Sequence, residues 1–279
     1  MDILRPEYLE EATVAVLKKA ETTLPGWVME LIEKAALKET HPVAKSQLEA
    51  IVENLKIAAQ EEIPICQDTG LPIFHIELGR DLKVSFDLEK TVAEGVRKAT
   101  QSIPLRPNAV NPLTRTNTDD NTGQGMPDLI LDLVEGENLR ITAFPKGAGS
   151  ENMGFLGMLN PADDPLEFVL KELATRIGKA CPPVFVGVGI GGTFDLSARL
   201  AKKALIKMPG SSNMELDLLA RINQLKIGPM GLGGDTTALG VKIETACCHT
   251  ASLPVAVNIQ CWANRSASAV VGEEGWNLD

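Results

Sequence analysis

Long hydrophobic runs and an export leader are what the sequence most plainly lacks. No stretch approaches the roughly 18 consecutive apolar residues that a membrane-spanning helix needs. Residues Met1–Glu11 carry acidic side chains and lack the basic start and apolar run of a signal peptide. These absences predict a cytoplasmic protein that does not act at a membrane.

Positive charge is scarce as well. The 279 residues include 27 Lys and Arg against 37 Asp and Glu, which gives a formal net charge of −10. A nucleic-acid surface needs a basic footprint, so nucleic acid is not an expected partner. A small basic pocket for an anionic substrate is still compatible with this charge, because Arg106, Arg115 and Lys146 lie in expected loops where cations can be aimed at an anion.

Closely spaced cysteine pairs are absent. The five cysteines include no Cys-x-x-Cys, which excludes a zinc ribbon and a thioredoxin motif. Thiols stay reduced in the cytoplasm, so metal binding or reactivity is the question these residues raise. Cys66, Cys181 and Cys261 stand alone at the ends of expected elements, whereas Cys247 and Cys248 are adjacent.

Three isolated cysteines can converge in space as soft thiolate ligands of an iron–sulfur cluster. Four thiolates saturate a cubane cluster, whereas three leave one iron open to act as a Lewis acid on a substrate oxygen. Free cysteine is also a common small core residue. The spacing alone leaves both interpretations open.

Hydrophobic periodicity predicts an α+β fold, a single mixed α/β domain over residues 1–279 with a helical N-terminal part. The order of the elements is too irregular for a doubly wound sheet. Apolar spacings of three and four predict helices over Tyr8–Leu24, Trp27–Leu37, Pro42–Gln60, Leu88–Thr100, Pro165–Lys179, Asp195–Leu205 and Met214–Leu225. Short apolar or alternating runs predict strands over Pro72–Leu78, Leu82–Phe86, Asp128–Val134, Asn138–Phe144, Val184–Ile190, Gly240–Cys247 and Pro254–Gln260.

Two segments between these elements draw attention. The stretch Ile103–Met126 is rich in Pro, Asn, Thr, Asp and Gly, and a loop of this length in a compact domain is usually functional or disordered. The strands Asp128–Val134 and Asn138–Phe144 are separated by Glu135-Gly136-Glu137, a spacing that favours a hairpin.

Glycine-rich segments and one histidine are further candidates. Backbone N–H groups at Gly147–Gly149, Gly187–Gly192 and Gly231–Gly234 could cradle a carboxylate or a phosphate, although turn geometry explains these glycines equally well. None of them matches a P-loop. His249 lies in Cys-Cys-His-Thr-Ala-Ser, where an imidazole could hold a carboxylate, move a proton or simply satisfy local hydrogen bonds.

Taken together, five motifs in order resemble the iron–sulfur-dependent (class I) fumarate hydratases, specifically the alpha subunit of the two-subunit form, and the related L(+)-tartrate dehydratase alpha subunit is similar. The resemblance covers nearly the whole chain. The motifs that carry it are Ile65-Cys-Gln-Asp-Thr-Gly70, Lys146-Gly-Ala-Gly-Ser-Glu-Asn152, Cys181-Pro-Pro with Gly189-Ile-Gly-Gly-Thr193, His249-Thr-Ala-Ser-Leu-Pro254 and Gln260-Cys-Trp-Ala-Asn-Arg265.

This resemblance implies a site, residue by residue. Cys66, Cys181 and Cys261 match the three ligands of a 4Fe–4S cluster with one open iron, and Cys247 and Cys248 fall outside the ligand motifs. Ala148 stands where a third glycine is frequent in the family, which blurs the choice of amide donor. The residues implied in substrate binding are Gln67, Asp68, Arg106, Gly147 or Gly149, and His249, of which Asp68 and His249 are also implied in catalysis.

The resemblance further implies a partner and a reaction. In single-chain relatives a second region follows the cluster motifs, so a separate beta subunit is expected to complete the active site in a hetero-oligomer. The implied reaction is the reversible hydration of fumarate to L-malate, with a small dicarboxylate as substrate. Two alternatives stay open at this point: L(+)-tartrate dehydration and a subunit that binds metal without catalysis.

Overall fold

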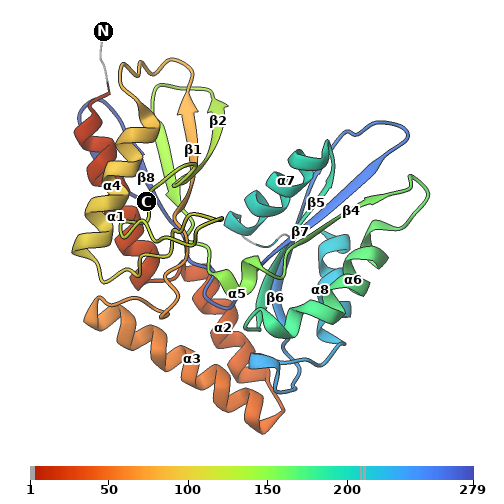
Figure 1. Cartoon of the computed structure of the whole chain (residues 1–279). Helices are drawn as coiled ribbons and strands as arrows, with labels where there is room; N and C mark the ends of the chain where they lie inside the picture. The colour runs from red at the N-terminus through yellow and green to blue at the C-terminus, as the bar shows by residue number, and fades with distance from the viewer. Residues whose placement is uncertain (1–3, 208, 210–211) are drawn as a thin grey trace. The chain divides into compact units, whose positions relative to one another are not determined.

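The computed structural model describes residues 4–207, 209 and 212–279, and the chain divides into two compact units (Figure 1). Unit 1 consists of the segment up to Pro25 together with Leu55–Gly147 and Arg265–Asp279, and unit 2 consists of Gly26–Asn54 and Ala148–Asn264. Each unit combines helices with its own sheet, which confirms the α+β class. The single domain over residues 1–279 stays a prediction.

Unit 1 is built on a five-stranded sheet in the order β2-β1-β3-β8-β9. Strands β1 and β2 are parallel and the other neighbours are antiparallel. Alternate side chains of β1, such as Phe74 and Ile76, join the buried core with residues of α1 and α4. The bounds are α1 Pro6–Thr22, α4 Leu88–Ser102, β1 Ile73–Gly79, β2 Asp128–Val134, β3 Leu139–Ala143, β8 Ala267–Val271 and β9 Trp276–Leu278.

Local chemistry explains where the two helices of unit 1 begin and how they meet. Pro6 stands at the first turn of α1, where a missing N–H costs nothing. The Asp87 side chain accepts a hydrogen bond from Lys90 N and caps α4. A Cβ on Gly95 would lie 2.6 Å from the Cβ of Thr13, so this glycine lets α4 pack closely on α1.

The hairpin expected between Asp128–Val134 and Asn138–Phe144 is wrong. Strand β1 lies between β2 and β3 and pairs with both. The connecting residues pass over the end of β1, where Gly79 N donates to Asn138 O (2.9 Å) and Asp81 N donates to Gly136 O (3.0 Å). A Cβ on Gly79 would lie 2.4 Å from Gly136 O, so glycine is required for this crossing.

The strand expected over Leu82–Phe86 is also absent from the described part of unit 1. Leu82, Val84 and Phe86 alternate into the hydrophobic core as the sequence pattern suggests. In place of a ladder of strand pairs, the backbone carbonyl of Lys83 accepts a hydrogen bond from Leu4 N (3.2 Å). The alternating pattern therefore predicted the burial of these side chains correctly, but a strand also needs a neighbouring strand to pair with, and this segment has none among the described residues.

Unit 2 is built on a four-stranded sheet in the order β4-β7-β5-β6. Val184, Val186 and Val188 of β5 form a core with α6 and α8 on one face. The helix α7 packs on the other face. Helix α3 (Pro42–Glu61) contributes residues to both units. The bounds of the other elements are β4 Phe155–Leu159, β5 Val184–Gly191, β6 Ala238–Ala246, β7 Leu253–Gln260, α2 Gly26–Lys38, α5 Ala148–Glu151, α6 Pro165–Arg176, α7 Phe194–Ile206, α8 Asn213–Asn223, and the 3-10 helices η1 Ile177–Lys179 and η2 Pro229–Gly231.

The glycines of β5 serve packing. A Cβ on Gly187 would lie 2.1 Å from the carbonyl oxygen of Ala201, and one on Gly189 would lie 2.1 Å from that of Ser197. Both residues are within the strand, so they form no turn that could cradle an anion. Instead they remove the side chains that would hold the backbone of α7 away from the sheet.

Gly189→Ala is therefore expected to lower the free energy of unfolding by about 1–3 kcal/mol, the usual cost of forcing extra volume into a packed interior. Urea denaturation followed by circular dichroism measures this loss. Gly26→Ala is the matched control, because no atom lies within 4 Å of its added Cβ. Equal midpoints for the Gly189→Ala variant and the wild-type chain would contradict this account of the helix–strand contact.

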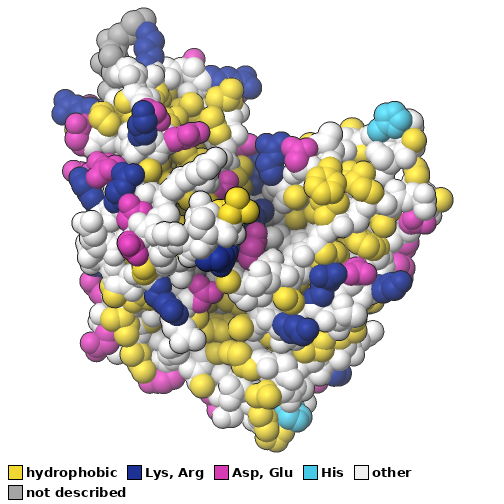
Figure 2. Space-filling model, in the orientation of Figure 1, with side chains coloured by type: hydrophobic (Ala, Val, Ile, Leu, Met, Phe, Trp, Pro, Cys, Tyr) yellow, Lys and Arg dark blue, Asp and Glu magenta, His cyan; other side chains and the backbone are white. Residues whose placement is uncertain are grey.

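The helices of the described residues were compared with what a membrane-spanning helix needs. Among residues 4–207, 209 and 212–279, none of them combines the length and the apolar character that a bilayer crossing demands. On the face drawn in Figure 2, basic and acidic side chains of the described residues are interspersed and form no continuous basic patch. This distribution agrees with the excess of acidic residues in the sequence.

Candidate functional site

The segment of residues 65–70, here called the Cys66 turn, is tied down at both ends within unit 1. Ile65 N donates to the backbone carbonyl of Glu21 (2.8 Å) at one end. At the other, Gly70 has φ +73°, and an added Cβ would lie 2.7 Å from backbone atoms of Lys146. Asp68 Oδ1 accepts from Gly70 N (3.0 Å), which closes a local Asx-type turn. The turn leaves Gln67 exposed and Cys66 and Asp68 half-buried.

Arg106 is held beside the Cys66 turn by its backbone. Arg106 N donates to Thr69 Oγ1 (3.0 Å), and the Asn108 side-chain amide donates to Gly70 O (3.0 Å). Asn121 ties this stretch back, because its Nδ2 donates to Arg106 O (3.0 Å) and its Oδ1 accepts from Asn108 N (2.6 Å). Arg106 is exposed, so the residue carries a solvent-accessible cation on a backbone that is anchored to the turn.

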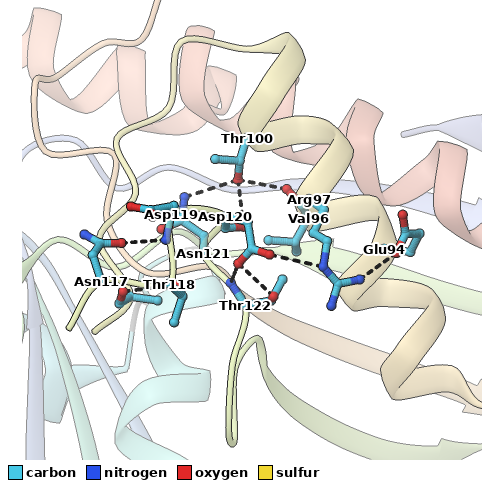
Figure 3. A network of polar contacts seen from close by, with 11 residues as sticks. Glu94, Val96, Arg97, Thr100, Asn117, Thr118, Asp119, Asp120, Asn121 and Thr122 are labelled. Carbon is cyan, nitrogen blue, oxygen red and sulfur yellow. Dashed lines mark hydrogen bonds and ion pairs between the residues drawn. The ribbon is translucent and has the colours of Figure 1, made fainter. Parts of the chain in front are cut away.

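A polar network orders the rest of the Ile103–Met126 loop on α4 (Figure 3). Asp120 Oδ1 accepts from Thr122 N (2.9 Å) and Thr122 Oγ1 (2.8 Å), and Arg97 Nε donates to Asp120 Oδ2 (3.1 Å). Burial opposes ionisation of Asp120, but these hydrogen bonds outweigh it and lower the pKa of the carboxyl. The long loop is therefore an ordered support for Arg106.

A buried ion pair lies behind the Cys66 turn. Arg265 Nη1 donates to Glu21 Oε2 at 2.7 Å, and the two side chains are 2% and 1% exposed. Burial, helped to a smaller extent by the nearby Asp68 charge, raises the pKa of Glu21 to about 7, although the charge and the hydrogen bond of Arg265 lower it.

Sequence reasoning assigned no role to this pair. Arg265 ends the motif Gln260-Cys-Trp-Ala-Asn-Arg265, but the motif predicted no function for this residue. Glu21 follows Thr13 and Leu17 at intervals of four on the buried face of α1. An acidic residue on the apolar side of an amphipathic helix was the signal that could have identified it.

Gly147 joins the Asp68 and Arg265 side chains. A Cβ at this position would lie 3.0 Å from Asp68 Oδ2 and 3.9 Å from Arg265 Nη2. Gly147 is buried, so the backbone here lies against the carboxylate and close to the guanidinium. Unit 1 thus brings together the turn with Gln67 and Asp68, the anchored Arg106, and Gly147.

In unit 2, Cys181 and Cys261 lie at one end of the sheet. Strands β5 and β7 are antiparallel with Phe185 opposite Gln260, so Cys261 follows the last pair and Cys181 precedes the first strand residue by three positions. Cys181 is exposed with φ +54°, a backbone conformation that non-glycine residues rarely adopt and that clusters at functional sites. At the same end, Ser150 Oγ donates to Gln260 Oε1 (3.1 Å) and ties the glycine segment at Gly149 to β7.

His249 lies at the opposite end of the same sheet. It belongs to the turn between β6 and β7, beyond the last residue of β5, where its Nδ1 accepts from Ala251 N (3.1 Å). The eight residues of β5 span about 25 Å at roughly 3.3 Å per residue. Within one chain, the structure does not bring His249 to Cys181 and Cys261. Cys247 and Cys248 share the exposed position of His249 in this turn.

This placement concerns two of the three cysteines that the sequence proposes as metal ligands. All five cysteines lie within the described residues, and two of the three proposed ligands, Cys181 and Cys261, share one sheet end. Across the described part of the chain, no group of three or more His, Cys, Asp or Glu side chains is gathered closely enough to hold a metal ion. Cys66 belongs to unit 1 and the other two to unit 2, so the three-cysteine site stays a prediction.

Comparison with known proteins gives a consistent family. Residues 10–270 match the family model described as fumarate hydratase (Fumerase). A Methanocaldococcus jannaschii protein provisionally named L(+)-tartrate dehydratase subunit alpha is 47% identical over 274 residues, covering 93% of this chain and 96% of the relative. The L(+)-tartrate dehydratase subunits alpha of Escherichia coli O157:H7 and of Shigella sonnei are 33% and 32% identical, each over 90% of this chain and 86% of the relative.

Proposed function

This chain belongs to the fumarate hydratase (Fumerase) family, and from that membership we propose that it is the catalytic alpha subunit of an iron–sulfur hydro-lyase that hydrates fumarate reversibly to L-malate. The observation that carries the proposal is the assembly in unit 1 of the half-buried Asp68, the anchored Arg106 and the buried Gly147. A cation and a backbone N–H are groups that bind the carboxylates of a small dicarboxylate, and an acidic side chain can relay a proton.

Cys66, Cys181 and Cys261 would hold the 4Fe–4S cluster. Their donor chemistry fits, because cysteine side chains supply the soft thiolates that iron–sulfur clusters take. Each retains some solvent exposure, unlike an inert core cysteine. When bound, a cluster with three protein ligands supplies an open iron that acts as a Lewis acid on the departing hydroxyl of the substrate.

The residues of unit 1 supply the remaining chemistry. The Arg106 guanidinium binds one substrate carboxylate in the forked geometry that arginine offers. A backbone N–H of Gly147 or Gly149 donates to the same group, whose negative charge grows as the adjacent carbon loses its proton. Fixed donors aimed at developing charge are typically worth about 3–4 kcal/mol each.

Asp68 orients or relays the proton through its carboxylate, and Gln67, exposed on the same turn, contacts the substrate. The principal base comes from the partner subunit. The names of the relatives, each a subunit alpha, support a separate beta subunit that completes the site in a hetero-oligomer.

The proposed role of His249 in binding substrate and moving a proton depends on where this residue lies relative to the cluster cysteines. His249 lies at the other end of the unit 2 sheet from Cys181 and Cys261. If the cluster rests on these two cysteines, the histidine that serves it must come from a second copy of the chain. The exposure of the β6–β7 turn is compatible with such a role.

L(+)-tartrate dehydration is the second candidate, and the names of the relatives favour it. Tartrate differs from malate by one hydroxyl group, so discrimination requires one further hydrogen bond in the pocket. A site that is built to pair with a substrate hydroxyl rejects the analogue that lacks it. The groups described above serve both substrates equally.

The test is an anaerobic reconstitution of the chain with its beta subunit, followed by steady-state assays on L-malate, fumarate and L(+)-tartrate. We expect turnover of L-malate and fumarate with kcat/KM well above that for L(+)-tartrate. The reverse ranking would assign the tartrate activity. A complex that contains the cluster and turns over none of the three would make the chain a metal-binding subunit without catalysis.

A further inference from the structure

Burial of the Glu21–Arg265 ion pair costs free energy. Taking two charges out of water costs several kcal/mol per ion, and apolar residues of similar volume are often as stable or more stable at such positions. Stability of the fold therefore gives a weak reason for this pair. Its surroundings give a stronger one, because both partners contact parts of the candidate site.

Glu21 acts on the Cys66 turn from two directions. Its backbone carbonyl accepts from Ile65 N (2.8 Å), the residue before Cys66. Its carboxylate binds the Arg265 guanidinium and is close enough to Asp68 for the two negative charges to affect each other. Without a cation between them, two carboxylates in this buried region would repel each other.

Arg265 supplies a cation that binds Glu21 and approaches Gly147, next to which Asp68 also lies. Nη1 binds Glu21, and Nη2 lies on the side of Gly147, where the Asp68 carboxylate also lies. Nε of Arg265 is fully buried and has no hydrogen-bond partner among the described residues. The guanidinium is therefore oriented by Glu21 through one nitrogen, which leaves Nη2 directed to the region of Asp68 and Gly147.

We propose that Glu21 and Arg265 are positioning residues that hold the Asp68 carboxylate against Gly147 in the geometry the reaction requires. Neither residue touches the substrate. The proposal rests on the proposed hydro-lyase function, since Asp68 is the group through which the pair would act. It predicts a loss of kcat without a matching change in KM.

The experiment removes both charges together, as Glu21→Leu with Arg265→Met, in the complex with the beta subunit. We expect kcat for the preferred substrate to fall about 100-fold, the scale on which a misplaced group of about 1 Å affects rate. KM is expected to stay within about twofold, and the melting temperature is expected to be equal or higher because an apolar pair replaces a buried ionic one. A wild-type kcat in this variant overturns the proposal.

A second readout does not depend on activity. Gly70 N donates to Asp68 Oδ1, so hydrogen exchange at Gly70 reports whether the carboxylate is held. We expect at least about tenfold faster exchange at Gly70 in the double variant, with exchange in α4 unchanged. Unchanged exchange at Gly70 overturns the proposal, and this measurement decides it even if the wild-type complex has no hydro-lyase activity and the proposed function fails.

A conservative variant covers the case in which the double variant does not fold. Arg265→Lys keeps the positive charge but loses the planar fork that lets one guanidinium serve two sites. We expect about a tenfold fall in kcat with KM retained and faster exchange at Gly70. Arg199→Lys, in the exposed pair with Asp195, is the matched control and is expected to match the wild-type complex in both measurements.

Discussion

Replacing Cys66, Cys181 or Cys261 with Ser, one at a time, is expected to abolish both the visible absorbance of the cluster and the hydro-lyase activity of the reconstituted complex. Thiolates are the ligands that iron–sulfur clusters require, and a serine hydroxyl is a harder and far weaker ligand for iron. With only three cysteines proposed as ligands, no other thiolate compensates for a loss. Absorbance spectra and steady-state rates of anaerobically prepared complexes measure the effect.

Cys247→Ser is the matched control. Cys247 lies in the exposed turn that follows β6, at the sheet end opposite Cys181 and Cys261. Its replacement is expected to leave the absorbance and the rate unchanged. An equal loss of absorbance in all four variants would refute the ligand assignment, because the loss would then follow cysteine replacement in general.

The elements of this fold were largely predictable from local pattern. Each of the seven expected helices occurs within a few residues of its expected bounds, among them α1 at Pro6–Thr22 and α3 at Pro42–Glu61. Long segments with apolar spacings of three and four favour one structure clearly. Strands β4, β8 and β9 were missed; each has only three to five residues, and β3, also of five residues, was expected only as part of the longer alternating run Asn138–Phe144.

Strand pairing was less predictable because it depends on residues far apart in the sequence. The spacing of Asp128–Val134 and Asn138–Phe144 favoured a hairpin, yet β1 enters between them. The glycine-rich segment Gly187–Gly192 was considered as a possible turn, but Gly187 and Gly189 are in a strand because α7 packs there. In both cases a distant partner decided the structure, and single-sequence patterns contain no information about such partners.

The same distinction applies to the candidate site. The Cys66 turn was identified from its motif and Arg106 as a loop cation that the family resemblance implies in substrate binding, and the structure brings them together through Thr69 and Asn108. Glu21 and Arg265 are 244 positions apart, and only the folded chain shows that they meet. Hydrophobic periodicity predicted that Glu21 lies on a helix, but such a pattern does not indicate which charged residue Glu21 pairs with.

Asp68→Asn is expected to reduce kcat/KM of the reconstituted complex by about 10²–10⁴-fold, the range associated with loss of a positioned acid or base. The substitution is nearly isosteric and separates two roles of this side chain. An asparagine carbonyl can still accept from Gly70 N, as Asp68 Oδ1 does at 3.0 Å, so the local turn is retained. The negative charge and the ability to carry a proton are lost. Steady-state rates with L-malate and with L(+)-tartrate measure the effect.

Three comparisons make this result specific to the carboxylate of Asp68. Hydrogen exchange at Gly70 is expected to increase less in Asp68→Asn, whose side-chain oxygen can still accept from Gly70 N, than in Asp68→Ala, which loses the turn as well. Asp81→Asn, at an exposed acidic residue of unit 1, is expected to retain full activity. If Asp68→Asn kept activity within about threefold of wild type while Asp68→Ala lost it, the side chain would serve the turn alone. The proton relay would then have to be assigned to another group, since a charge that can be removed without loss of rate takes no part in the transition state.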